Sequence, residues 1–255
     1  MAFFQANFYS EALGFQTTVN VFIPQRSTTG QIGVAGNAAN GEYKCIYLLH
    51  GLSDDHSIWL RRTSIERYAD EYGICVVMPF GGRSFYTDMK HGEKYYTYIS
   101  EELPCLMAEF FGISTKRENN FIAGLSMGGY GALKIGLKNP QRYAACAGLS
   151  AVADIRGWTE GCPELMTPIF GENPRVPASE DLFNLAETVN QNPVKPRVYM
   201  GVGTEDFLYE GNVKLKEKFE SLDFDFTYRE SSGTHCWAFW DEYIQYVLKW
   251  MFGEK

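Results

Sequence analysis

Apolar runs alternate along this chain with segments of helical spacing. Residues 17–24 alternate apolar and polar positions, which predicts a strand. Residues 43–50, YKCIYLLH, form a continuous apolar run that ends in His-Gly, a pattern typical of a strand buried on both faces. Between them, residues 30–42 are rich in Gly and Asn, which predicts a loop.

From there the chain repeats strand and helix. Segments with apolar residues three or four positions apart predict helices at 58–73, 94–112, 127–140, 211–222 and 238–252. Short apolar or alternating runs predict strands at 74–80, 120–126, 143–150, 196–203 and 223–231. Pro104 should bend the second helix or mark its start. These units predict an α/β fold with a mostly parallel central sheet and helices on both faces.

One connection is much longer than the others. Residues 153–180 are rich in Pro and Gly, and connections of this length are usually functional or disordered. Active sites of such folds lie beyond the carboxyl ends of the strands, so we expect a lid insertion here, with a passive surface excursion as the alternative. We expect residues 1–255 to form a single domain.

The motif Gly124-Leu125-Ser126-Met127-Gly128 predicts the nucleophile. Gly-Leu-Ser occurs three times, at 51–53, 124–126 and 148–150, but only the second copy continues with x-Gly between a predicted strand and a predicted helix. That context is the nucleophile elbow of the α/β-hydrolase fold, where small neighbours let strand and helix approach. The alternative is a tight turn with an uninvolved serine.

A serine hydroxyl needs a base, and the chain has four histidines. His235 lies in a polar loop between the last predicted strand and the last helix, so it can reach Ser126 over the carboxyl edge of the sheet. It also completes the chain order Ser, acid, His of this fold, which His91 violates. We therefore expect His235 to be the base.

The base needs a carboxylate that holds its tautomer and stabilises the imidazolium. Asp206, just after the strand at 196–203, is the first choice. Its neighbour Glu205, and Asp154 after the strand at 143–150, remain alternatives.

His50-Gly51-Leu52 follows the strand at 43–50, where this fold places its second oxyanion donor. We expect the backbone N–H groups of Leu52 and Met127 to be the two donors, with His50 orienting the loop. Asp54, Asp55 and His56 resemble a metal cluster, but no further ligands stand at suitable spacing, so we expect no metal.

Composition and charge limit the classes of partner that we expect for this protein. The formal net charge is −8 and the isoelectric point about 5.1, which disfavours nucleic acid. The first residues have neither the basic nor the apolar region of a signal peptide, and no run of 18 apolar residues predicts a membrane span. The six cysteines show no C-x-x-C pair. We therefore expect a cytoplasmic protein.

Aromatic residues make up 15% of the chain, and we expect Trp237 to be among those that line the substrate pocket.

Three segments together carry a family resemblance: residues 48–89, residues 96–104 and residues 121–134. They resemble the bacterial tributyrin esterases of the esterase D group, which includes S-formylglutathione hydrolases. The resemblance implies hydrolysis of small short-chain acyl esters, no cofactor, and homo-oligomerisation. It carries the same nucleophile, acid, base and oxyanion donors as chosen above, and it places Arg83 and Tyr86 near the site. Ser53-Asp54 stands where S-formylglutathione hydrolases carry Thr-Cys, which argues against glutathione thioesters.

Three other functions remain open at this point. A thioesterase of the S-formylglutathione hydrolase type and an acyltransferase would use the same triad. A non-catalytic binding module would have the fold without the activity.

Overall fold

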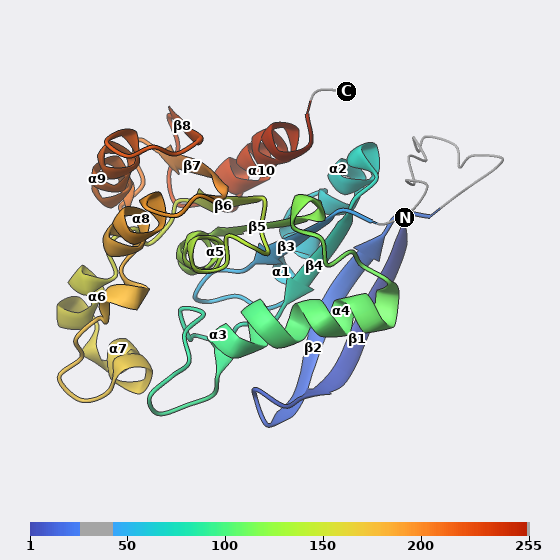
Figure 1. Ribbon diagram of the computed structural model, residues 1–255, viewed down its shortest axis with the longest axis horizontal. Coiled ribbons are helices and arrows are strands. Elements are labelled where there is room, and N and C mark those ends of the chain that lie inside the picture. The colour runs from blue at the N-terminus through green and yellow to red at the C-terminus, as the bar shows by residue number, and fades with distance from the viewer. Residues whose placement is uncertain (26–42, 254–255) are drawn as a thin grey trace.

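The computed structural model describes residues 1–25 and 43–253, and these residues build around one eight-stranded sheet (Figure 1). The predicted loop at 30–42 lies outside the described residues. The strand order is β1-β2-β4-β3-β5-β6-β7-β8; β1 pairs with β2 and β2 with β4 in antiparallel fashion, and all other pairs are parallel. The strands span Ala2–Ser10 (β1), Phe15–Ile23 (β2), Cys45–Leu49 (β3), Cys75–Pro79 (β4), Asn120–Leu125 (β5), Ala145–Leu149 (β6), Arg197–Gly203 (β7) and Phe226–Ser231 (β8).

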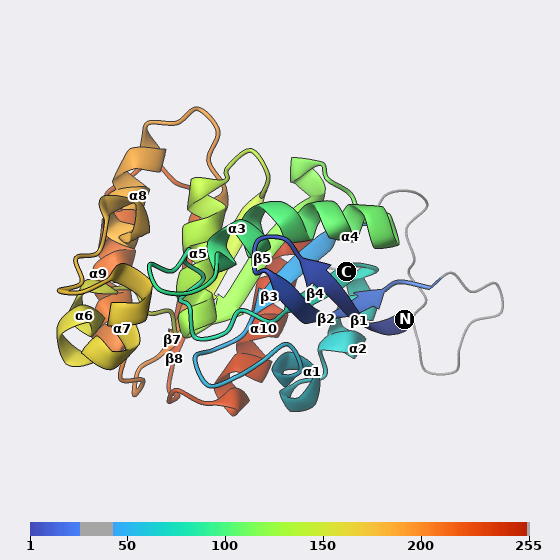
Figure 2. The same ribbon diagram turned by 90° about the horizontal axis from the view of Figure 1, so that it is seen from below.

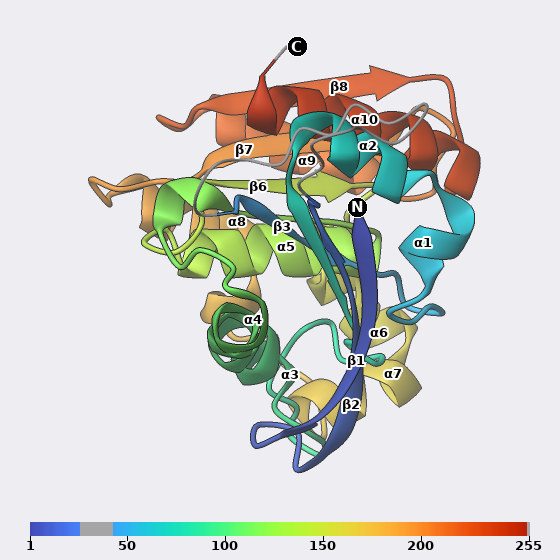
Figure 3. The ribbon, with the colours of Figure 1, turned by 90° about the vertical axis from the view of Figure 1, so that its right-hand side faces the viewer.

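Helices cover both faces of the sheet (Figures 1 and 3). Side chains of β3 alternate between the two cores: Tyr47 and Leu49 join the core under α4, α5, α8 and α9, while Ile46 and Leu48 join the core under α1, α2 and α10. The predicted α/β layering is thereby confirmed. These helices span Ile58–Arg62 (α1), Ile65–Tyr72 (α2), Leu103–Phe111 (α4), Met127–Lys138 (α5), Leu182–Asn190 (α8), Tyr209–Glu220 (α9) and Trp237–Phe252 (α10).

The predicted helix at 58–73 is wrong as a single element, because it divides into α1 and α2. Thr63 lies at the division. Its hydroxyl donates to the carbonyl of Trp59 at 2.6 Å and accepts from the N–H of Ile65 at 3.1 Å. One side chain therefore satisfies a group at the end of α1 and another at the start of α2, as local Ser and Thr bonds commonly do.

The predicted helix at 94–112 contains a change of winding before Pro104. A short turn, α3 (Tyr95–Thr97), leads into a π-helical stretch over Tyr98–Glu102, and α4 begins at Leu103 with the proline in its first turn. Proline has no N–H to donate into the preceding turn, so it is tolerated where a helix starts.

Strand β1 is an element that the hydrophobic pattern did not predict. Its burial alternates poorly, with Phe3, Phe4 and Tyr9 all exposed, because it lies at the edge of the sheet. The nine residue pairs of its register with β2 hold it in place.

The long connection at 153–180 contains two α-helices, α6 (Arg156–Gly161) and α7 (Pro163–Phe170), and ends in a short 3-10 helix over Ala178–Glu180. Both α-helices lie on the side of the molecule away from β1 (Figures 1 and 2). The strand arrows of β6 and β8 point toward the end of the molecule where α1, α6 and α7 are found (Figure 3). The backbone N–H groups of Lys90 and His91 donate to the carbonyls of Ile169 and Pro168, both at 2.9 Å, which joins α7 to the loop after β4.

Candidate active site

Ser126 lies on a strained turn between β5 and α5. Its φ of 55° and ψ of −119° are unusual for a residue with a side chain. A Cβ on Gly124 would lie 2.3 Å from the carbonyl oxygen of Gly128, and a Cβ on Gly128 would lie 2.5 Å from that of Leu49. Both flanking positions must therefore be glycine, as the elbow geometry requires.

The structure brings the three predicted triad residues together from three distant parts of the chain. His235 Nε2 lies 3.0 Å from Ser126 Oγ, within hydrogen-bond distance. His235 Nδ1 lies 2.8 Å from Asp206 Oδ2 and 3.0 Å from Oδ1. This arrangement lets the serine donate to the imidazole while the imidazole donates to the carboxylate.

Asp206 is held ionised by the groups around it. Its side chain is fully buried, and burial raises the pKa of this carboxyl. Hydrogen bonds from His235, from the N–H of Leu208 and from the hydroxyl of Ser150 outweigh burial and keep the pKa below its usual value. The indole N–H of Trp240 donates to Ser150 Oγ at 3.1 Å, so Ser150 has a fixed orientation.

Ser150 is a site residue that the sequence interpretation missed. It belongs to the third Gly-Leu-Ser copy, at the carboxyl end of β6, and has a φ of 45°. Its position in the sequence could have indicated this, because a polar residue at the carboxyl end of a buried strand lies beside the active-site edge of the sheet.

The two alternative acids have other contacts. Glu205 accepts from the N–H of Gly233 and so holds the loop that carries His235. Asp154 accepts from the N–H of Arg156 at 3.1 Å and lies on the surface. Asp206 is therefore the carboxylate in contact with the imidazole.

Two residues, Leu52 and Met127, are expected to donate backbone N–H groups to the oxyanion. In the described part of the chain neither Leu52 N–H nor Met127 N–H donates to a protein acceptor, although Met127 is buried at the start of α5. The positive end of the helix dipole adds to the attraction of an anion there. Leu52 lines the same cavity as Ser126.

His50 holds the loop that carries Leu52. Its Nδ1 donates to the carbonyl of Gly51 at 2.7 Å, and its Nε2 accepts from the N–H of Gly81 at 2.8 Å. Burial lowers the pKa of His50 to about 4, so the ring is neutral in this role. This placement agrees with the orienting role expected from the sequence.

A cavity of about 480 Å³ opens over Ser126 and His235. Trp237 lines it, as expected. Arg83 and Tyr86 do not: Arg83 is exposed, and Tyr86 is fully buried with its hydroxyl donating to the carbonyl of His50. The remaining lining includes Gly51, Leu52, Ser53, Asp54, Leu125, Trp158, Phe207, Cys236 and Trp240.

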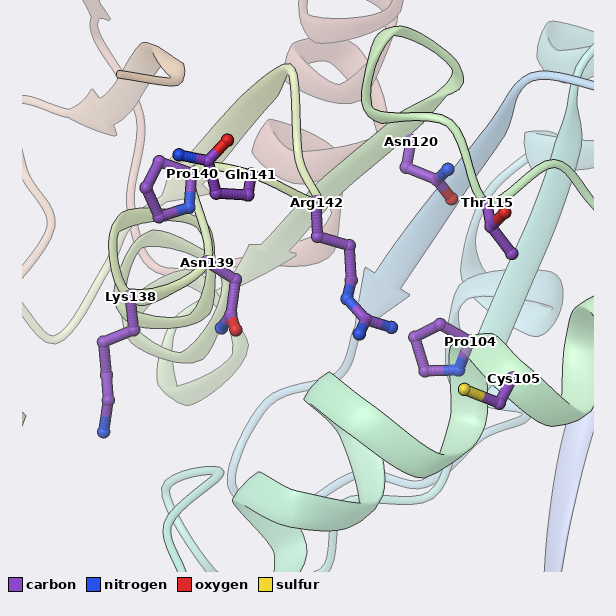
Figure 4. Close-up of a pocket in the computed structure, with 9 residues that line it drawn as sticks. All are labelled: Pro104, Cys105, Thr115, Asn120, Lys138, Asn139, Pro140, Gln141 and Arg142. Atoms are coloured by element: carbon purple, nitrogen blue, oxygen red, sulfur yellow. The ribbon is translucent and has the colours of Figure 1, made fainter. Parts of the chain in front are cut away.

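A second cavity, of about 440 Å³, is similar in size but lies elsewhere. Figure 4 shows Arg142 extending between Asn139 and Pro104 in this cavity. Asn120, at the first residue of β5, lines it, whereas Ser126 follows the last residue of β5, about 20 Å along the strand. Size does not separate the two cavities. The serine–histidine contact identifies the first as the candidate active site.

A buried ion pair joins the long connection to the helix that follows Ser126. Lys134 of α5 is fully buried and donates to Glu180 at 2.6 Å, to Thr87 at 2.7 Å and to the carbonyl of Phe85 at 3.0 Å. Burial lowers the pKa of Lys134 to about 8 despite the adjacent carboxylate. Tyr130, also in α5, donates to the carbonyl of Glu180 at 2.6 Å.

The chain is similar to known esterases over almost its whole length. The model of a family described as "Putative esterase" matches residues 10–251. An acetyl esterase of Caldicellulosiruptor saccharolyticus is 32% identical over 264 residues, which cover 98% of each chain.

Solved structures give the same result. FphF, a fluorophosphonate-binding serine hydrolase of Staphylococcus aureus, overlaps with a TM-score of 0.89 at 30% identity and 99% coverage of both chains. An S-formylglutathione hydrolase (FrmB) of the same organism has a TM-score of 0.86, also at 30% identity and 99% coverage of both. These overlaps confirm the predicted α/β-hydrolase fold.

Proposed function

Because the chain belongs to this esterase family and is a serine esterase, we propose that it hydrolyses short-chain acyl esters through an acyl-enzyme on Ser126. The observation that carries the assignment is the continuous contact from Ser126 Oγ through His235 to the buried carboxylate of Asp206. A serine in this contact has the base that its hydroxyl otherwise lacks.

The mechanism has two halves. His235 Nε2 takes the proton of Ser126 as Oγ attacks the ester carbonyl, and the N–H groups of Leu52 and Met127 donate to the oxyanion. His235 then passes the proton to the leaving alcohol, and the acyl group stays on Ser126. A water molecule attacks the acyl-enzyme with His235 again as the base, which releases the acid and restores the hydroxyl. Asp206 stabilises the imidazolium in both halves.

The size of the cavity favours the proposal that the substrates are small. Its volume of about 480 Å³ is at the smaller end for ligand pockets, and Trp158, Trp237 and Trp240 are among the residues that line it. Trp158 comes from α6, so we propose that residues 153–180 form a lid that supplies one wall of the cavity. A relative named acetyl esterase supports a short acyl group.

The test is a series of p-nitrophenyl esters that differ only in acyl length. We expect higher kcat/KM on acetate and butyrate than on the twelve-carbon laurate, and mass spectrometry of quenched enzyme should find the acyl group on the peptide that contains Ser126. A higher kcat/KM on laurate than on butyrate would refute the short-chain proposal. An acyl group on another residue would refute the nucleophile.

Thioester hydrolysis is the second candidate, because the FrmB neighbour is named for it. The same residues would perform the reaction on a thioester carbonyl. S-formylglutathione belongs in the same series, and a kcat/KM on it far above that on acetate esters would make the thioester the better substrate. Added alcohols, with the products analysed for transferred acyl groups, test the acyltransferase alternative.

A further inference from the structure

The ionisable side chains of the active-site cavity carry an unbalanced charge. Among the described residues that line it, Asp54 is the only one that carries a carboxylate, and none is Lys or Arg. Asp206 lies behind His235 and is paired with it. We infer, on the basis of the proposed function, that the site prefers esters of cationic alcohols to neutral or anionic ones, with Asp54 as the residue that determines this preference.

Asp54 lies close to the nucleophile. The point that a Cβ on Gly51 would occupy is 3.1 Å from Asp54 Oδ2 and 3.8 Å from Ser126 Cβ. The carboxylate accepts from the N–H of Gly51, and the N–H of Asp54 donates to the Gly51 carbonyl at 3.2 Å. The turn therefore fixes the charge beside the place where the ester is attacked.

Aromatic rings complete a site suited to a cation. Trp158, Phe207 and Trp237 line the same cavity as Asp54. Phe207 is 70% exposed and its ring centre lies 4.6 Å from that of His235, so it lies beside the imidazole at the surface of the molecule. Ring faces attract ammonium groups, and quaternary ammonium ligands are bound by such aromatic walls.

Other charges near Asp54 do not cancel its charge. Burial raises its pKa, the Asp55 carboxylate adds to this, and the Gly51 N–H and the exposed Arg62 oppose it. Asp55 is turned to the N–H and hydroxyl of Ser57, at 2.8 and 2.6 Å. The preference should therefore be measured near pH 8, where the Asp54 carboxylate is ionised.

The experiment compares two acetate esters of matched shape. Acetylcholine carries a quaternary ammonium group, and 3,3-dimethylbutyl acetate has carbon in place of that nitrogen. Acetate release in a pH-stat gives kcat/KM for both by one readout. We expect the kcat/KM ratio of acetylcholine to the neutral ester to exceed one in the parent enzyme, and to fall roughly 3- to 50-fold in Asp54→Asn, the range for two unit charges about 7 Å apart at dielectric constants of 80 and 20.

Asp54→Asn keeps an oxygen that can accept from Gly51, so a displaced oxyanion loop would lower both rates and leave their ratio unchanged. Asp55→Asn removes the adjacent charge outside the cavity and is the matched control, with an expected change in the ratio below about twofold. A parent ratio at or below one, or an equal ratio in the parent and Asp54→Asn, overturns the inference. Hydrolysis of both esters that persists in Ser126→Ala would instead overturn the proposed function.

Discussion

The Nδ1 atom of His235 lies 2.8 and 3.0 Å from the two carboxylate oxygens of Asp206, although 29 residues separate them in the chain. The contact places Asp206 behind the ring, on the side away from Ser126. A carboxylate there selects the tautomer whose Nε2 is free to accept the serine proton.

Asp206→Asn should therefore cost far more activity than a change at either alternative acid. An amide cannot stabilise the imidazolium and can reverse the tautomer, and the equivalent change in a serine protease lowers kcat by about 10⁴-fold. We expect Glu205→Gln and Asp154→Asn to lose much less in kcat on p-nitrophenyl acetate. If Asp154→Asn is the most damaging of the three, the acid has been assigned to the wrong strand.

Ser126→Ala should abolish both turnover of p-nitrophenyl acetate and labelling by a fluorophosphonate probe, with the fold retained by circular dichroism. Ser53→Ala is the control, because it removes another serine hydroxyl of the same cavity. Activity of Ser126→Ala within about tenfold of the parent contradicts the nucleophile, since loss of the attacking group normally removes far more.

Leu52→Ala and Leu52→Pro distinguish the contribution of the Leu52 side chain to kcat from that of its backbone N–H. Alanine keeps the donor and should change kcat modestly, while proline removes it. Loss of one oxyanion donor in subtilisin cost about 10²–10³ in kcat, and we expect a similar loss here. Proline also restricts Gly51, so thermal unfolding of both variants must be compared. Equal kcat values at equal stability would show that another group holds the oxyanion.

His50 should make the folded state sensitive to acid. Its pKa is about 4 in the folded protein against about 6.5 in an unfolded chain, so the unfolded state binds the extra proton between these values. This contribution to the free energy of unfolding is complete above pH 6.5 and is lost as the pH falls to 4, by about 3 kcal/mol at most. Urea unfolding across this range should show a shallower pH dependence for His50→Gln than for the parent.

His91→Gln, on an exposed loop, controls for the change of residue type. If His50→Gln keeps the full pH dependence of the parent, the acid sensitivity arises from other groups.

Much of the fold could be predicted because its central strands are buried on both faces. Residues of β3 and β4 are all buried, and a continuous apolar run is the direct consequence. Strand β1 escaped because its exposed edge carries no such pattern. Helix α8, over Leu182–Asn190, escaped because it follows the Pro-rich connection, although Asp181 caps it by accepting from the N–H of Phe183.

The candidate site could be predicted as far as each residue had a local signal. Ser126 has the glycines around it, and His235 and Asp206 each follow a strand. Ser150 and Asp54 have contacts that depend on neighbours distant in the sequence or on the direction of a side chain, which spacing does not reveal. Tyr86, expected near the substrate, instead donates its hydroxyl to the carbonyl of His50 beneath the loop that carries Leu52.

The buried pair of Lys134 and Glu180 restricts how this sequence can diverge. Loss of Glu180 leaves the fully buried Lys134 without its carboxylate, which typically destabilises a protein by about 3–5 kcal/mol, whereas Glu180 keeps the ammonium of Lys138 at 2.9 Å when Lys134 is lost. That destabilisation is a large part of the stability of an ordinary domain. Descendants of this chain can therefore lose Lys134 before Glu180 more easily than Glu180 before Lys134, so the order of the two substitutions is constrained.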